Sequence, residues 1–115
     1  MEMAEQKCVP CSGDTPALKH EEALRMANEI PGWEIGDGKI ERTFKFPNFV
    51  EAMRFANKIT RIAQEEDHHP ELHISWGKVR IELSTHAVGG LSKNDFIVAA
   101  KINKLAEAER DAQAI

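Results

Sequence analysis

Apolar residues recur along the chain with two periods, one typical of helices and one typical of strands. Residues 19–30 and 49–66 carry apolar side chains three and four positions apart, which predicts two amphipathic helices. Asn48 is expected to cap the second helix, and the helix should end at Asp67, shortly before Pro70. The stripes expected to be buried are Ala23, Leu24, Ala27 and Ile30 in the first helix, and Phe49, Ala52, Met53, Ala56, Ile59 and Ala63 in the second.

Two pairs of short alternating segments predict two β-hairpins. Residues 33–35 and 40–46 flank a glycine-rich turn, and residues 72–76 and 79–83 flank a turn at Gly77-Lys78. A third helix is predicted after Ser92, which forms a capping box with Asp95. The order α-β-β-α-β-β-α predicts an α+β fold, with a four-stranded antiparallel sheet from two hairpins and three helices packed on one face.

The N-terminal residues show neither period. Residues 1–17 are predicted to form an irregular arm before a single domain over residues 18–115. Cys8 and Cys11 lie in this arm as a C-x-x-C pair, away from the strand–helix junction of a thioredoxin-type motif. Two interpretations stay open: a structurally minor segment, or a redox or metal site completed by His20 or a second subunit.

Composition and charge narrow the classes of partner. The 115 residues are 42% hydrophobic and 30% charged, which is typical of one globular domain. The net charge of −4 argues against direct nucleic-acid binding, which needs a basic face. No apolar run approaches the roughly 18 residues of a membrane span, and the first residues contain no signal-peptide core. We therefore expect a cytoplasmic protein without a membrane partner.

Four of the five histidines lie close together, at positions 68, 69, 73 and 86. Pairing the strands of the second hairpin should bring His86 to the end of the sheet where His68 and His69 enter. Imidazole exchanges a proton near neutral pH, so this group predicts an acid–base site. His73 lies within a strand and is interpreted as a bystander. A metal site with Asp67 and the other three histidines is the alternative.

A set of short motifs resembles the pterin-4a-carbinolamine dehydratase family. They are Asp67-His68-His69-Pro70-Glu71, Trp76-Gly77-Lys78-Val79, Ser84-Thr85-His86, Gly90-Leu91-Ser92 and Asp95-Phe96. They follow the family's order over most of residues 18–105. The resemblance implies a 4a-hydroxytetrahydrobiopterin dehydratase, a hydro-lyase that uses no cofactor and no metal. It would remove water from a 4a-hydroxy-tetrahydropterin to give quinonoid dihydropterin, in pterin recycling.

The resemblance also implies roles for particular residues. The catalytic residues would be His68, His69 and His86, with the proton donor and acceptor roles open between His68 and His86. Substrate-binding or orienting residues would be Asp67, Ser84, Thr85 and Asp95. Asp95 is explained equally well as part of the helix cap. Many family members carry an acid four residues before the first histidine, where this chain has Gln64; either Glu65 or Glu66 could substitute for it, or the role is dispensable.

Two further expectations come with the resemblance. Family members form homodimers or homotetramers, and we expect one of these states here. Some relatives instead act as transcriptional coactivators or Rubisco assembly proteins, so a non-catalytic binding or assembly role on the same fold is the alternative function. Those roles need a surface and have no physical need for three histidines.

Overall fold

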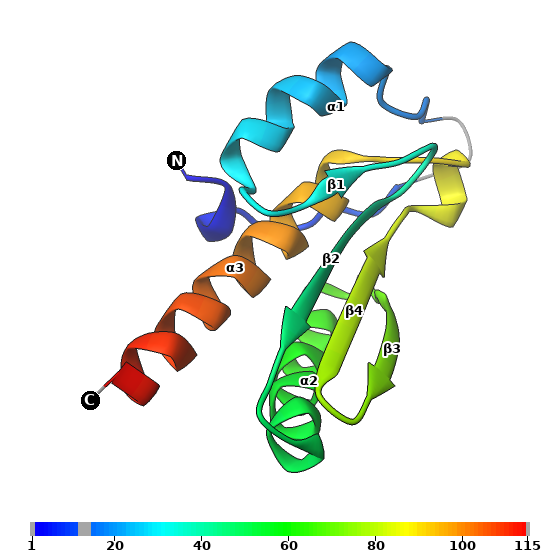
Figure 1. Ribbon diagram of the computed structural model, residues 1–115. Coiled ribbons are helices and arrows are strands. Elements are labelled where there is room, and N and C mark those ends of the chain that lie inside the picture. The colour runs from blue at the N-terminus through cyan, green and yellow to red at the C-terminus, as the bar shows by residue number, and fades with distance from the viewer. Residues whose placement is uncertain (1, 12–14, 115) are drawn as a thin grey trace.

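The computed structural model describes residues 2–11 and 15–114 (Figure 1). The strands are β1 Glu34–Ile35, β2 Ile40–Lys45, β3 Glu71–Ser75 and β4 Lys78–Leu83. The α-helices are α1 His20–Met26, α2 Phe49–Glu66 and α3 Lys93–Ala114, and three short 3₁₀ turns are η1 Met3–Glu5, η2 Ala27–Glu29 and η3 His86–Val88. This order confirms the α+β fold predicted from the sequence. No helix in the described part of the chain is both long enough and apolar enough to cross a membrane.

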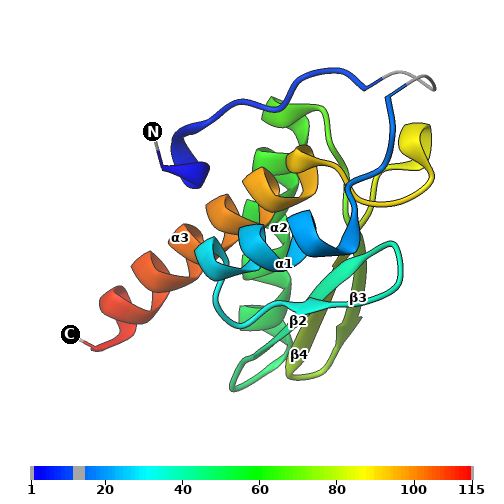
Figure 2. The same cartoon turned by 90° about the horizontal axis from the view of Figure 1, so that it is seen from above.

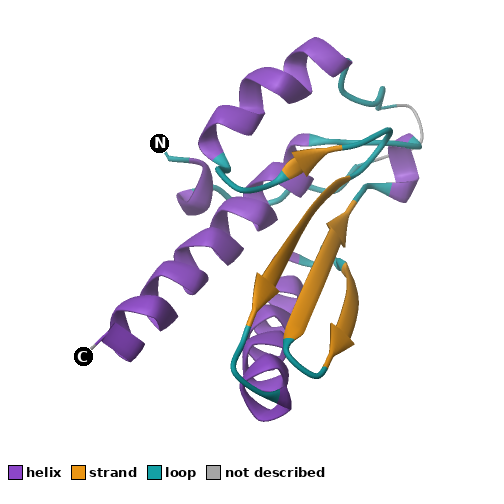
Figure 3. Cartoon of the chain, viewed as in Figure 1, coloured by secondary structure: helices purple, strands orange, loops and turns teal. Residues whose placement is uncertain are grey.

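The strands form one antiparallel sheet in the order β1-β2-β4-β3 (Figure 3). The two hairpins therefore join through β2 and β4, with Ile40 opposite Leu83 and Phe44 opposite Val79. These four side chains are buried. Side chains on the other face are mostly polar or charged, among them Glu41, Lys45, His73, Lys78, Arg80 and Glu82. The alternation thus turns the apolar face toward the helices, which lie on that side of the sheet (Figure 2).

Helix α2 begins and ends where the sequence predicts. The side chain of Asn48 accepts a hydrogen bond from the Glu51 N–H at 2.9 Å, which confirms the expected cap. The prediction of the buried stripe of α2 is wrong at one large residue, Phe49, which is 48% exposed. Phe55 is buried instead, and its ring centroid lies 5.0 Å from that of Phe44 and 5.1 Å from that of Phe46. Phe44 of β2 and Phe46 just after it therefore pack on the second turn of α2, and the first residue of the helix stays at the edge of this contact.

Two other predicted core positions lie at the surface. The second hairpin turns at Trp76-Gly77, one residue earlier than predicted, because Ser75 already pairs with Lys78. Trp76 is consequently 68% exposed in the turn and does not continue the alternation of β3. In the first helix, Ala23 and Ile30 are buried but Leu24 is exposed. The regular α-helix there ends at Met26 and continues as the 3₁₀ turn η2, so the predicted single helix has two parts.

The described residues of the N-terminal arm lie across α3. Met3, in η1, is buried in the main core, and the Ala4 carbonyl accepts a hydrogen bond from Lys101 Nζ at 2.7 Å. Figure 2 shows the arm, in dark blue, continuing past the start of α3 to the end of α2. The arm therefore reaches the end of the molecule where the predicted histidine site lies.

Candidate active site

The end of α2 fixes the position of the first histidine. Asp67 has left-handed backbone geometry, with φ of 51°. The Asp67 N–H donates to Gln64 O at 3.4 Å and the His68 N–H donates to Ala63 O at 3.1 Å. This is the Schellman arrangement that ends many helices, and Asp tolerates the left-handed conformation better than most residues. His68 therefore leaves the helix in a direction set by hydrogen bonds of the backbone.

Asp95 joins three separate stretches of chain. Its Oδ1 lies 2.6 Å from His68 Nε2, while its Oδ2 accepts hydrogen bonds from the Thr85 hydroxyl at 2.8 Å and the Ser92 N–H at 2.9 Å. The Ser92 hydroxyl lies 2.8 Å from Thr85 Oγ1, so each hydroxyl of this group has a partner. Asp95 is fully buried, and three partners replace the water that the carboxylate loses on burial. Asp95 thus serves both functions left open by the sequence, helix cap and contact of the histidine.

The contact with Asp95 decides which ring nitrogen of His68 remains for a ligand. An ionised carboxylate can only accept hydrogen bonds, so the 2.6 Å contact requires a proton on Nε2. Nδ1 is then the nitrogen that can accept a proton and later return it. The His68 side chain is 11% exposed, so most of the ring is covered by the protein.

A cavity of about 480 Å³ opens beside His68. Residues 65–68 at the end of α2 form one part of its lining, and residues 8–11 of the N-terminal arm form another. Thr85, Ala87 and Asn94 complete it. This volume is within the range that protein cavities use for small organic ligands. The His68–Asp95 pair therefore lies at a cavity that can hold a bicyclic ring.

The other predicted site residues lie around this cavity to different degrees. Asp67 and Thr85 line it, and Thr85 is buried. His86 begins η3 between two lining residues but is itself exposed and is not part of the lining. Ser84 is partly exposed just after β4, and no hydrogen bond of its side chain is found within residues 2–11 and 15–114. That His68 and His86 act together thus stays a prediction.

His69 points to a different partner from His68. Its Nε2 lies 2.6 Å from Gln64 Oε1, and both side chains are exposed. An amide oxygen accepts hydrogen bonds, so this contact also fixes a proton on Nε2 of His69. The neutral amide of Gln64 therefore holds the second histidine without adding charge.

The residues that could hold a metal ion differ from those named in the metal alternative, which were Asp67 and three histidines. Within the described residues, the group whose ligand atoms lie close enough together to hold a metal ion is Glu71, His73 and Glu82, on the outer face of the sheet. Glu82 is already paired with Lys39 at 2.8 Å and with Arg80, and the hydrogen bond from Lys39 lowers the pKa of Glu82. His73 lies 2.8 Å from Glu82. A cation there would compete with two basic side chains.

Glu66 and Asn94 also line the cavity; of the two, only Glu66 was considered from the sequence, as one of two acids that could replace the one missing at position 64. Glu66 is buried and accepts a hydrogen bond from the Cys8 N–H at 2.8 Å. Burial alone would raise the pKa of Glu66, but the Cys8 N–H together with the charges of Lys101 and Lys7 outweighs it and holds the pKa below its ordinary value. A charged residue three positions after the buried Ala63 on an apolar stripe was a usable signal. Asn94, also buried, carried no such signal.

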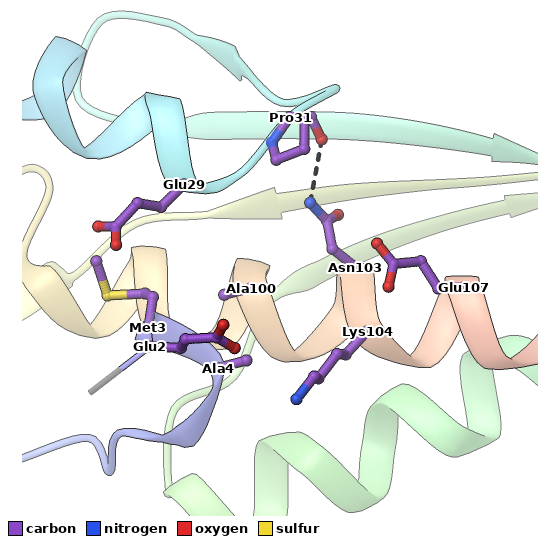
Figure 4. A pocket seen from close by; sticks show the side chains of 9 residues that line it. All are labelled: Glu2, Met3, Ala4, Glu29, Pro31, Ala100, Asn103, Lys104 and Glu107. Atoms are coloured by element: carbon purple, nitrogen blue, oxygen red, sulfur yellow. Dashed lines mark hydrogen bonds between the residues drawn. The ribbon is translucent and has the colours of Figure 1, made fainter.

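Figure 4 shows another cavity, of about 320 Å³, between η1, the end of the first helix and α3. Asn103 is one of its lining residues; it donates to Pro31 O at 3.1 Å and accepts from Trp33 Nε1 at 2.7 Å. These hydrogen bonds tie α3 to the turn that precedes β1. No histidine in the described part of the chain lines this cavity, whereas His68 lines the previous one.

Comparison with known sequences identifies the family. A sequence profile described as Pterin 4 alpha carbinolamine dehydratase matches residues 16–105, which is most of the chain. The chain is 45% identical to a protein of Rubrobacter xylanophilus over 105 residues, covering 90% of this chain and 98% of that one. It is 46% identical to a protein of Methylococcus capsulatus over 103 residues, covering 88% and 90%. Both relatives carry the provisional name pterin-4-alpha-carbinolamine dehydratase. The chain belongs to this family.

Two solved structures are similar to this chain. A protein of Brucella melitensis described as a transcriptional coactivator/pterin dehydratase superposes with a TM-score of 0.73 at 32% identity, over 78% of this chain and 98% of that one. A pterin dehydratase-like protein described as a RuBisCO assembly factor in the α-carboxysome superposes with a TM-score of 0.53 at 17% identity, over 64% and 86%. The second likeness shows the fold alone.

Proposed function

We propose that this protein removes water from a 4a-hydroxy-tetrahydropterin by histidine acid–base catalysis. The observation that carries the proposal is the contact of His68 Nε2 with the buried Asp95 at the edge of a 480 Å³ cavity. Family membership supplies the substrate class. The cavity volume supports it, since 480 Å³ is large enough for a pterin ring. The substrate we propose is 4a-hydroxytetrahydrobiopterin or a related 4a-hydroxy-tetrahydropterin.

The reaction needs two proton transfers and no electron transfer. The hydroxyl on C4a accepts a proton and leaves as water when the C4a–O bond breaks. N5 loses its proton, and the electrons of that N–H bond form the C4a–N5 double bond of quinonoid dihydropterin. One acid and one base are sufficient, and each positioned group contributes about 10²- to 10⁴-fold.

In this proposal His68 and His86 exchange the two protons, and His69 holds the substrate or shares the proton transfer. His68 is suited to its part because Asp95 occupies Nε2 and leaves Nδ1 for the substrate. Asp95 orients the ring without touching the substrate, so it is a positioning residue. Thr85 links Asp95 to the loop that carries His86, and with Ser84 and Asp67 it would contact the edge of the pterin.

An assembly or coactivator role is the second candidate. The structural relative from Brucella melitensis, described as both coactivator and dehydratase, supports it. Such a role would need a surface and would place no demand on the tautomer of a histidine. The Asp95 network therefore favours the enzyme, and the two roles can occur in one protein.

The proposal is tested by following the decay of a 4a-carbinolamine in a rapid-mixing cell, with and without the protein. We expect the decay to speed up in proportion to protein concentration and the product to be quinonoid dihydropterin. A chelator in excess should leave the rate unchanged, which separates acid–base catalysis from a metal-assisted reaction. Decay at the rate of buffer alone would overturn the proposal and leave the assembly role.

A further inference from the structure

The N-terminal segment 8–11 lines the same cavity as His68. Cys8, Val9, Pro10 and Cys11 all contribute to the lining, although they precede His68 by about half the chain. Val9 is 64% exposed at the edge of this cavity. An exposed apolar residue at the edge of a cavity with polar groups is a common arrangement where a ligand covers it.

Asn94 holds this segment by both of its amide atoms. The Val9 N–H donates to Asn94 Oδ1 at 3.0 Å, and Asn94 Nδ2 donates to Val9 O at 2.6 Å. The side-chain amide thus pairs with both backbone groups of one residue, as a neighbouring strand would. Asn94 is buried in the first turn of α3, one residue before Asp95. The residue that holds the arm is therefore adjacent in sequence to the residue that holds His68.

Glu66 fixes the same segment from the end of α2. Its Oε1 accepts from the Cys8 N–H at 2.8 Å, and its Oε2 lies 3.4 Å from Lys7 Nζ and 3.9 Å from Lys101 Nζ. A hydrogen bond to a buried carboxylate is among the stronger ones in proteins. Asn94 and Glu66 together place residues 8 and 9 relative to both helices that carry the His68–Asp95 pair.

The arm also carries the thiol of Cys8, which is mostly protonated at neutral pH. Burial raises the pKa of the Cys8 thiol to about 12, and the nearby Glu66 carboxylate adds to the effect. The Cys8 thiol lies 3.7 Å from Asn94 O, and Asn94 Nδ2 lies 3.5 Å from Cys11 Sγ. A thiol that stays protonated is a poor nucleophile. The position of Cys8 in the segment is therefore better explained by the shape of the segment than by the reactivity of this thiol.

We propose that segment 8–11 forms a wall of the pterin-binding site, that Val9 and Pro10 contact the bound pterin, and that Asn94 and Glu66 are the residues that position this wall. The proposal rests on the proposed function for the identity of the ligand. The proposal gives the arm a direct part in pterin binding. The sequence had left two other interpretations of the arm open, a structurally minor segment or a redox or metal site.

Protection of Cys11 from alkylation tests whether segment 8–11 forms a wall of the binding site. This test does not depend on catalytic activity. The full-length protein is treated with iodoacetamide, with and without saturating 7,8-dihydrobiopterin, and each cysteine is followed by peptide mapping. Equilibrium dialysis measures pterin binding in the same samples. We expect bound pterin to slow the alkylation of Cys11 about tenfold or more, because it fills the cavity that Cys11 lines.

The outcomes separate the two proposals. Protection of Cys11 without acceleration of the dehydration would contradict the proposed function and leave the wall in place. Saturable binding with an unchanged rate at Cys11 would overturn the wall, whatever the activity. Failure to bind the pterin at all would overturn it too.

Two variants test the residues. Val9→Ala should raise KM about three- to tenfold with little change in kcat, since only binding contacts are lost. Val50→Ala is the matched control, because Val50 is 63% exposed at the opposite end of α2 and should leave KM unchanged. Asn94→Ala should raise KM and also speed the alkylation of Cys8, because the arm loses its clamp. An unchanged KM in both Val9→Ala and Asn94→Ala would contradict the proposal.

Discussion

His68 Nε2 lies 2.6 Å from Asp95 Oδ1, and this contact connects the end of α2 to the first turn of α3. Neither residue reaches this position by packing alone. A Schellman motif directs His68 out of its helix, and the capping interaction with the Ser92 N–H holds Asp95 at the start of the next one. The same hydrogen bonds that end one helix and begin another therefore orient the proposed acid–base group.

Replacing Asp95 with Asn should impair catalysis more than folding. The amide keeps the shape but cannot accept hydrogen bonds with both of its heavy atoms, so one of the contacts to His68, Thr85 and Ser92 is lost. We expect kcat to fall about 10²-fold from a misplaced ring, and the free energy of unfolding to fall by about 1–3 kcal/mol.

The ¹⁵N chemical shifts of the His68 ring distinguish orientation from general destabilisation. In the wild type they should report a proton on Nε2, and in Asp95→Asn a mixture of tautomers. A normal kcat in a folded Asp95→Asn protein would show that the carboxylate is only a helix cap.

The Cys8 thiol should react slowly with alkylating reagents, because its pKa is raised to about 12 by burial and by Glu66. Glu66→Gln removes the charge and keeps an oxygen that accepts from the Cys8 N–H. The pKa of Cys8 should then fall toward 9.0, its ordinary value, while burial keeps it above that value. The measurement is the rate of Cys8 alkylation against pH, by peptide mapping. If the pKa of Cys8 does not change in Glu66→Gln, the Glu66 carboxylate is not a cause of the raised value.

Glu66 should also make stability depend on pH in the acid range. Its pKa is lower in the folded protein than the ordinary value of 4.5, so the unfolded chain binds its proton first as pH falls. Its contribution to the free energy of unfolding is therefore complete above pH 4.5 and is lost as pH falls through the lowered pKa. Urea unfolding of wild type and Glu66→Gln should differ most near neutral pH. A difference that grows in acid would have the wrong sign for this account.

Loss of the α2 cap should affect stability and leave the site intact. Asn48→Ala removes the hydrogen bond to the Glu51 N–H and should cost about 1 kcal/mol. The matched control is Asn57→Ala, an exposed position in the middle of the same helix, which should cost less. Because Asn48 and His68 lie at opposite ends of α2, kcat should stay at the wild-type value. Thermal unfolding and the dehydration assay measure the two effects.

Most of the fold could be predicted because its elements carry local signals. The bounds of α2 followed from Asn48 before it and Pro70 after it, and the hairpins followed from alternation around glycines. Phe49 was wrongly expected to be buried. Periodicity shows which face of a helix is apolar, but it does not show which turns of that helix the sheet covers. Trp76 was wrongly extended into β3 because a two-residue turn can begin at a bulky residue as well as at a glycine.

The site was predictable only where the residues themselves carry the chemistry. His68 was expected at a site because a cluster of imidazoles is recognisable in sequence, and Asp95 because of the family resemblance; the structure adds the contact between them. The arm was not placed, because its position depends on hydrogen bonds between the Asn94 amide or the Glu66 carboxylate and backbone groups far away in the chain. Backbone partners leave no pattern of residue types, so no period or motif could show them.

The most direct test of the central claim is the rate of 4a-carbinolamine decay with His68→Ala beside wild type and His73→Ala. His73 is a control of the same residue type, on the outer face of the sheet and in contact with Glu82. The account predicts that His68→Ala folds and loses about 10²- to 10⁴-fold of the acceleration, while His73→Ala keeps it. Equal acceleration by His68→Ala and wild type would contradict the role assigned to His68.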